Sequence, residues 1–185
     1  MRRILLWGVL VAVLLAVAVW ALRSRLTGPD LPILGQVTPF SLTDHRGETI
    51  TLDDLAGAPW IADFIFTRCG LSCPLMTTRM AELDDERVAP EVRLVSISVD
   101  PENDTPHVMK EYLKRYRAKP GWDFLTGSRA DIDTVMTAFD AYIPDKMSHF
   151  PLNMIREPKT GRWIRLFGIM SSRDFLAEYK KVADQ

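Results

Sequence analysis

Two nearly uninterrupted apolar runs, residues 60–66 and 92–99, constrain the fold of this 185-residue chain more than any other feature. Strands that are apolar on both faces are typical of the centre of a parallel sheet, because helices cover both of its sides. Between the two runs, apolar residues recur at helical spacing, namely Leu75, Met76, Met80 and Leu83. The sequence therefore predicts a β-α-β unit at the core of an α/β domain.

The rest of the chain continues this alternation. Short strands are predicted around turns or between helices at residues 40–42, 50–52, 122–125, 152–156 and 162–167. Helix starts are predicted at the capping positions 104–106, Ser128 and Ser172. This order predicts a mostly parallel central sheet with helices on both faces.

The N-terminal segment has a different character. From Ile4 to Leu22 no charged residue occurs, and about 19 residues of helix would span roughly 28 Å, close to the thickness of a bilayer core. Arginines precede and follow this run, as in an export signal. A cleaved signal peptide and a retained anchor are both compatible with it, and the length favours the anchor. We expect a signal or transmembrane anchor at 1–26, a linker at 27–35 and a domain at 36–185 on the exported side, which is the periplasm in a bacterium.

Composition excludes several classes of protein. Hydrophobic residues make up 47% of the chain and charged ones 25%, which argues against disorder. The net charge is −1, and residues 27–185 hold 19 basic against 24 acidic side chains, so we expect no nucleic-acid partner. Two cysteines are too few for a disulfide scaffold or a four-thiolate zinc site.

Those two cysteines, Cys69 and Cys73, stand where the first apolar run meets the predicted helix. If the helix includes both, their side chains lie on one face about one turn apart. The amides at a helix start stabilise thiolates, and the carboxyl ends of strands are where ligands bind in α/β sheets. A redox disulfide, a two-thiolate metal site and a reactive nucleophile all remain open. An inert disulfide over so short a loop would add little stability.

A metal site needs a third ligand, for which the chain offers three histidines. His45 and His107 are expected to be solvated. His149 lies in a loop just before a predicted strand, and with a hairpin returning beside the sheet this loop can approach the cysteine-bearing helix. Two thiolates and an imidazole suit copper in both oxidation states, and zinc is the alternative. Asp63, within the first apolar run, is either a buried proton relay to the thiols or paired with a helix N-terminus.

Three sequence blocks, residues 64–74, 96–106 and 124–128, resemble the SCO/SenC family. The resemblance covers roughly residues 36–183. It implies a thioredoxin-like fold, a membrane anchor and copper bound by Cys69, Cys73 and His149. It also implies a role in assembling the copper A centre of cytochrome c oxidase, so that the expected partner is the copper A subunit or another copper-site apoprotein. Ser148 and Phe150 depart from the acid and the serine that the family commonly has beside the histidine.

We therefore expect a membrane-anchored copper chaperone rather than an enzyme. The alternative is a thiol–disulfide oxidoreductase in which Cys69 attacks a partner disulfide and Cys73 resolves the mixed disulfide. A peroxide-reducing enzyme is the third reading; it needs an arginine that activates the cysteine, and Arg68 is expected to point away.

Overall fold

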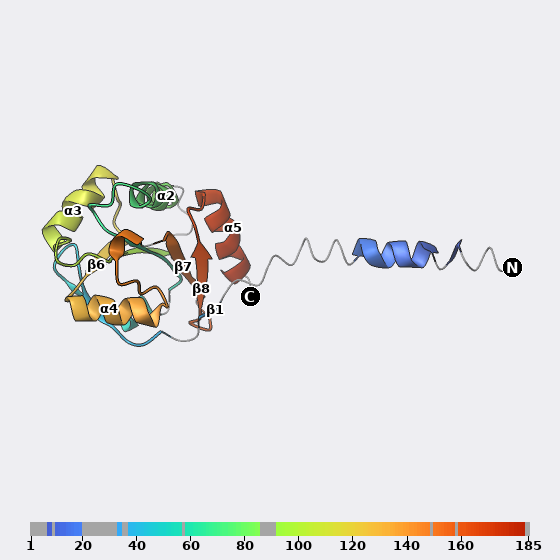
Figure 1. Cartoon of the computed structure of the whole chain (residues 1–185), viewed down its shortest axis with the longest axis horizontal. Coiled ribbons are helices and arrows are strands. Elements are labelled where there is room, and N and C mark those ends of the chain that lie inside the picture. The colour runs from blue at the N-terminus through green and yellow to red at the C-terminus, as the bar shows by residue number, and fades with distance from the viewer. Residues whose placement is uncertain are drawn as a thin grey trace. The chain divides into compact units, whose positions relative to one another are not determined.

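The computed structural model describes residues 7–8, 10–19, 33–34, 37–56, 58–85, 92–148, 150–157 and 159–183. The chain divides into two units, residues 1–31 and 32–185. In the first unit, residues 7–8 and 10–19 are helical (Figure 1). Among the described residues, no helix combines the length and the apolar character needed to cross a membrane. The ends of the expected span, residues 4–6 and 20–22, lie outside the described residues, and the anchor stays a prediction.

The second unit is built on an eight-stranded sheet with the order β1-β8-β7-β4-β5-β6-β2-β3. The strands are β1 (Ile33–Leu34), β2 (Ser41–Asp44), β3 (Thr49–Thr51), β4 (Trp60–Ile65), β5 (Arg93–Ser98), β6 (Trp122–Thr126), β7 (Leu152–Arg156) and β8 (Trp163–Phe167). β4, β5 and β6 are parallel and form the centre. β1, which pairs with β8, falls within the expected linker.

The expectation of a mostly parallel sheet is wrong. In the part of the chain that the structure describes, only the β4–β5 and β5–β6 pairings are parallel, and the other five are antiparallel. The reason is that two hairpins, β2–β3 and β7–β8, flank the β-α-β-α-β centre, and a short hairpin connection joins only antiparallel strands. The predicted hairpins thus determine the edges of a mixed sheet.

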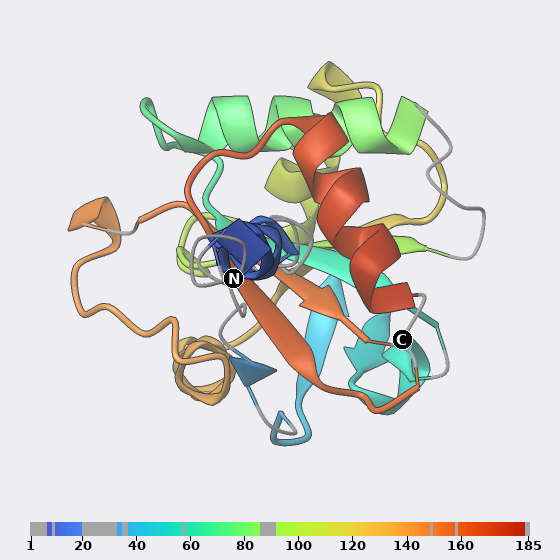
Figure 2. The ribbon, with the colours of Figure 1, turned by 90° about the vertical axis from the view of Figure 1, so that its right-hand side faces the viewer.

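Four helices cover the sheet, namely α2 (Cys73–Asp85), α3 (Pro106–Arg115), α4 (Arg129–Ala138) and α5 (Ser172–Ala183). Figures 1 and 2 show α4 on the opposite side of the sheet from α2 and α3. α3 and α4 begin as predicted: Thr105 caps α3 ahead of Pro106, and Ser128 forms a capping box with Asp131.

The core packs aromatic rings against the centre of the sheet. Phe139, directly after α4, lies edge-on to Phe64 of β4 and Trp163 of β8, with ring centroids 5.6 and 4.8 Å apart. Trp60 meets Trp163 at 4.1 Å. Edge-to-face pairs of this kind stabilise beyond the area that they bury. They fix the central strands, and β4 leads directly into the cysteines.

Candidate functional site

The two cysteines lie on the loop that joins β4 to α2. Cys69 is in a turn, with its amide donating to Phe66 O at 3.2 Å, and α2 begins at Cys73. The helix therefore includes only the second cysteine. Cys69 is partly exposed and Cys73 is buried, and both thiols are free. The pair is available for redox or metal chemistry.

The environment of the loop makes the two thiols unequal. Partial burial opposes ionisation of Cys69, but hydrogen bonds from the Cys73 thiol and from the amides of Leu71, Ser72 and Cys73 outweigh it and lower the pKa of Cys69. Burial raises the pKa of Cys73 to about 12, and the hydrogen bond to Cys69 adds to this effect. Of the two thiols, Cys69 is therefore the one that ionises more readily.

Asp63 lies beneath the cysteines in β4 and is fully buried. Neither carboxylate oxygen has a hydrogen-bond partner of normal geometry. Burial raises the pKa of Asp63 to about 7, and a side-chain interaction with Ser96 on β5 opposes this without cancelling it. Its charge also contributes to the raised pKa of Cys73. Of the two expectations for Asp63, the buried acid is confirmed and the helix-paired acid is wrong.

Two acids from the loop after β5 hold the cysteine loop in place. Asp104 accepts hydrogen bonds from the amide and hydroxyl of Thr67 and from the hydroxyl of Ser98. Burial raises the pKa of Asp104, and the bonds from Ser98 and Thr67 limit the rise. Asp104 therefore links the cysteine loop, through Thr67, to Ser98 at the end of β5.

The second acid, Asp100, is fully buried and contacts two different loops. It accepts from Arg68 at 3.4 Å and from Lys146 at 2.6 Å, and Asn103 donates to it at 2.8 Å. Burial opposes its ionisation, but the bonds from Lys146, Asn103 and Arg68 prevail and lower the pKa of Asp100. Arg68 thus interacts with Asp100, as expected for an arginine that points away from the thiols.

His149 lies outside the described residues, so its role as third ligand stays a prediction. Its neighbours on both sides are described. Lys146–Ser148 form the short helix η2, which Lys146 links to Asp100. On the other side, β7 pairs antiparallel with β4, with Asn153 opposite Asp63. The start of β7 therefore lies beside the end of β4, where the cysteine loop begins.

The other two histidines have other surroundings. His107 is exposed in the first turn of α3, as expected. His45 is half-buried rather than solvated: its Nδ1 accepts from the Phe124 amide at 3.4 Å, and burial lowers its pKa. Asp44, His45 and Asp123 offer ligand atoms within 4.8 Å of one another, as no other such group of the described residues does.

Arginines already neutralise this second cluster. Arg46 lies 2.5 Å from Asp44 and 2.9 Å from Asp123, and Arg93 lies 2.5 Å from Asp123. A metal ion would have to compete with both guanidinium groups, because they already balance the charge of the two carboxylates. We infer that the cluster is structural.

Comparisons with known proteins identify the family. The SCO1/SenC family profile matches residues 35–178, well over half of the sequence. The chain belongs to the SCO1/SenC family. The SCO1 protein homolog of Bacillus subtilis is 42% identical over 106 residues, which is 55% of each chain. The human mitochondrial SCO1 homolog is 36% identical over 115 residues, 60% of this chain and 37% of that protein. The chain thus spans about half or less of these relatives.

Solved structures of Sco proteins have the same fold. BsSco, a cytochrome c oxidase assembly protein of the Sco family in which a disulfide switch was identified, matches with a TM-score of 0.71 and 30% identity over 85% of this chain and 97% of its own. Bradyrhizobium japonicum ScoI, solved with copper bound, matches with a TM-score of 0.64 and 29% identity over 80% and 99%. The predicted thioredoxin-like fold is confirmed.

Exposed apolar side chains occur in the cysteine loop and on both sides of position 149 of this Sco-family chain. Leu71, between the cysteines, is 77% exposed, and Met147 of η2 is 61% exposed. Phe150 and Phe167, whose rings lie 5.7 Å apart, are exposed near the start of β7 and at the end of β8. Clustered exposed apolar side chains are typical of a place where a protein partner binds.

Sequence reasoning missed Asp100 and Asp104 as parts of the site. A signal for them exists: both lie in the short segment between the end of β5 and the start of α3, at the edge of the sheet where ligands bind. Their partners Thr67, Arg68 and Lys146 come from other loops, and this pairing became visible only in the folded chain.

Proposed function

We propose that this SCO1/SenC protein binds one copper ion through Cys69, Cys73 and His149 and takes part in assembling the copper A centre of cytochrome c oxidase. The observation that carries the proposal is the pair of free thiols in the loop between β4 and α2, one partly exposed and one buried, in a family with copper-bound members. The acceptor of the copper would be the copper A subunit or another copper-site apoprotein.

The donor set fits copper as a cargo. Thiolates are soft ligands that favour Cu(I), and an imidazole suits Cu(I) and Cu(II). Because Cys73 is protonated at neutral pH, binding through both sulfurs releases protons, so uptake is expected to strengthen as pH rises. A Cys69–Cys73 disulfide offers no thiolate, and oxidation would therefore block loading.

Release to a partner needs direct contact with the thiols. Leu71, between the two cysteines, presents an exposed apolar side chain that a partner's copper-binding loop can cover. Covering it excludes water and brings the partner's cysteines to the sulfurs, where thiolates exchange as ligands.

A thiol–disulfide oxidoreductase is the second candidate, and the unequal thiols favour it. The Cys69 thiolate attacks one sulfur of a partner disulfide, forming a mixed disulfide and releasing one partner thiolate. Cys73 then loses its proton and attacks the Cys69 sulfur, which releases the second partner thiolate. The partner gains two electrons, and the chain ends with a Cys69–Cys73 disulfide.

We also propose the chain's location. Residues 1–26 act as the signal or membrane anchor, residues 27–35 link it to the domain, and residues 36–185 lie on the exported side, the periplasm in a bacterium. The uncharged run between arginines supports this arrangement. Protease digestion of intact spheroplasts tests it: the domain should be cleaved from outside while the membrane stays closed.

Copper titration of the reduced protein tests the ligand set. The wild type should bind one equivalent, Cys69→Ser and Cys73→Ser should lose Cu(I) binding, and His149→Ala should weaken Cu(II) binding most. His107→Ala is the matched control, because His107 is exposed on α3. A His149→Ala protein with the wild-type affinity and spectrum would show that the third ligand is wrong. Rapid reduction of a partner disulfide by copper-free protein would favour the second candidate.

A further inference from the structure

The Asp100 carboxylate is a junction between two loops that are distant in sequence. One oxygen, Oδ1, accepts from Lys146 at 2.6 Å and from Asn103 at 2.8 Å, and the other, Oδ2, accepts from Arg68 at 3.4 Å. The Asp100 amide donates to Ser98 Oγ at 3.0 Å, which fixes the residue to the end of β5. Charge-assisted bonds to a buried carboxylate are among the stronger polar contacts in proteins.

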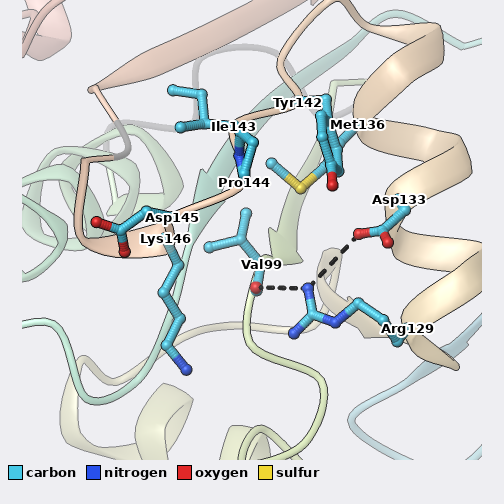
Figure 3. A pocket seen from close by; sticks show the side chains of 9 residues that line it. All are labelled: Val99, Arg129, Asp133, Met136, Tyr142, Ile143, Pro144, Asp145 and Lys146. Atoms are coloured by element: carbon cyan, nitrogen blue, oxygen red, sulfur yellow. Dashed lines mark hydrogen bonds and ion pairs between the residues drawn. The ribbon is translucent and has the colours of Figure 1, made fainter.

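The two loops are the ones that carry the proposed ligands. Arg68 immediately precedes Cys69, and Lys146 begins η2, shortly before His149. Figure 3 shows the Lys146 side chain extending past Val99, the residue before Asp100. One carboxylate therefore connects the cysteine loop and the histidine loop to the same strand.

Little else holds η2 in place. The other hydrogen bonds described for Met147 and Ser148 go to Asp145, within the same loop. Both side chains are exposed. Before η2, the chain lines a recess of about 290 Å³ between Tyr142, Pro144, Met136 and Arg129, so packing is incomplete there (Figure 3). Among the described residues, the Lys146–Asp100 pair is the contact that ties η2 to the sheet.

We propose that Asp100 is a positioning residue of the metal site: it holds the histidine loop against the cysteine loop and so sets the approach of the third ligand to the two sulfurs. This inference rests on the proposed function. Cu(I) can be held by two thiolates, whereas Cu(II) depends more on the imidazole. Loss of the junction should therefore weaken Cu(II) binding much more than Cu(I) binding.

The test compares four variants of the full-length reduced protein. Asp100→Asn and Lys146→Gln should each weaken Cu(II) binding by about 10–100-fold, the range found when the group that orients a metal ligand is lost. They should also shift the sulfur-to-Cu(II) absorption band and leave Cu(I) affinity within a small factor. Lys146→Arg should restore binding. Glu102→Gln is the matched control, because Glu102 is exposed in the same loop and pairs with Arg129.

A metal-free measurement separates this inference from the proposed function. Amide hydrogen exchange over residues 146–150 should accelerate in Asp100→Asn and Lys146→Gln and stay unchanged in Glu102→Gln. If His149→Ala showed that the histidine is not a ligand, the proposed function would fail, and unchanged exchange would independently overturn the junction. Equal losses of Cu(I) and Cu(II) affinity would overturn the positioning role, as would faster exchange with unchanged Cu(II) binding.

Discussion

The parallel strands β4, β5 and β6 carry a cluster of polar side chains at each end, and the two clusters are neutralised differently. Near the amino end of β6, the buried carboxylates of Asp44 and Asp123 are paired with Arg46 and Arg93. At the carboxyl ends of β4 and β5, Arg68 and Lys146 pair with Asp100, and the thiols of the cysteine loop are free.

The difference shows what separates a structural cluster from a reactive one. Asp44, His45 and Asp123 have ligand atoms close enough to share an ion, but their charges are already balanced. Among the described residues, no cation pairs with Cys69 or Cys73, and Arg68, which precedes Cys69, bonds to Asp100 instead. Free donors, rather than donor geometry alone, mark the site that an external soft cation or a disulfide can reach.

The largest expected effect is a difference in alkylation rate between the two cysteines at the carboxyl ends of the parallel strands. At pH 7, iodoacetamide should modify Cys69 about 10²–10³-fold faster than Cys73, because only the thiolate reacts. The pKa of Cys69 is lowered, whereas the pKa of Cys73 is raised to about 12. Timed alkylation of the reduced protein followed by peptide mass spectrometry measures both rates.

Cys73→Ala provides the control for this asymmetry. It removes the side chain that donates to Cys69, so the pKa of Cys69 should rise and its alkylation should slow at neutral pH. Equal alkylation rates for the two cysteines of the wild type would contradict the proposed division into an attacking and a protonated thiol.

The next effect concerns the buried acid beneath the cysteines. The pKa of Asp63 is about 7 in the folded chain against 3.8 for a free side chain, so the folded state keeps a proton that the unfolded state loses. Below about pH 4, Asp63 is protonated in both states and does not oppose folding. As pH rises from about 4 to about 7, the free energy of unfolding falls, and above about pH 7 it no longer changes on account of Asp63. The total loss is on the order of 4 kcal/mol.

Asp63→Asn should remove this pH dependence. Urea unfolding at pH 5 and pH 8 measures it: the wild type should lose stability between the two, and the variant should change much less. Asp104→Asn is the comparison variant for this pH dependence. Burial also raises the pKa of Asp104, but the hydrogen bonds from Thr67 and Ser98 limit the rise. A wild type equally stable at both pH values would show that Asp63 is ionised in the fold.

At the amino end, a substitution should affect stability and leave copper binding unchanged. Asp123→Asn leaves Arg46 and Arg93 without a full counter-charge and should cost about 2 kcal/mol, less than a fully buried pair because both arginines are partly hydrated. Copper stoichiometry should remain one equivalent. Glu48→Gln, at an exposed partner of Arg46, should cost less than about 0.5 kcal/mol. Loss of a bound metal from Asp123→Asn would show that the cluster of Asp44, His45 and Asp123 is a metal site rather than a structural one.

The sequence determined the central elements closely, because their signals are local. The apolar runs predicted β4 and β5 almost residue by residue, and Ser128 predicted the start of α4. The cysteine pair was found for the same reason: a strand, two thiols and a helix follow one another directly. The predicted hairpins were correct. Each adds antiparallel strands to the sheet, and the sheet is therefore mixed rather than mostly parallel.

The parts that could not be predicted depend on contacts between distant segments. Whether Asp63 is buried or paired could not be decided from its own strand, because Ser96 and Asn153 lie on neighbouring strands. Asp100 likewise has no periodic signal, and its partners come from two other loops. The same holds for Asp44 and Asp123, whose cluster with His45 forms only when β2 pairs with β6.

The smallest effect tests the apolar surface around the thiols. Leu71 is the most exposed large apolar residue of the described part of the domain, so Leu71→Asn should leave stability and copper affinity unchanged. If a partner covers Leu71, the substitution removes about 1 kcal/mol of contact, and copper transfer or reduction of the partner's disulfide should slow about fivefold. Leu71→Met keeps an apolar contact and should retain the wild-type rate. Stopped-flow mixing with an apoprotein that carries a copper A dithiol measures the transfer. Equal rates for Leu71→Asn and Leu71→Met would show that the partner reaches Cys69 without covering this surface, and the reactive end would then resemble the amino-end cluster in lacking a docking face.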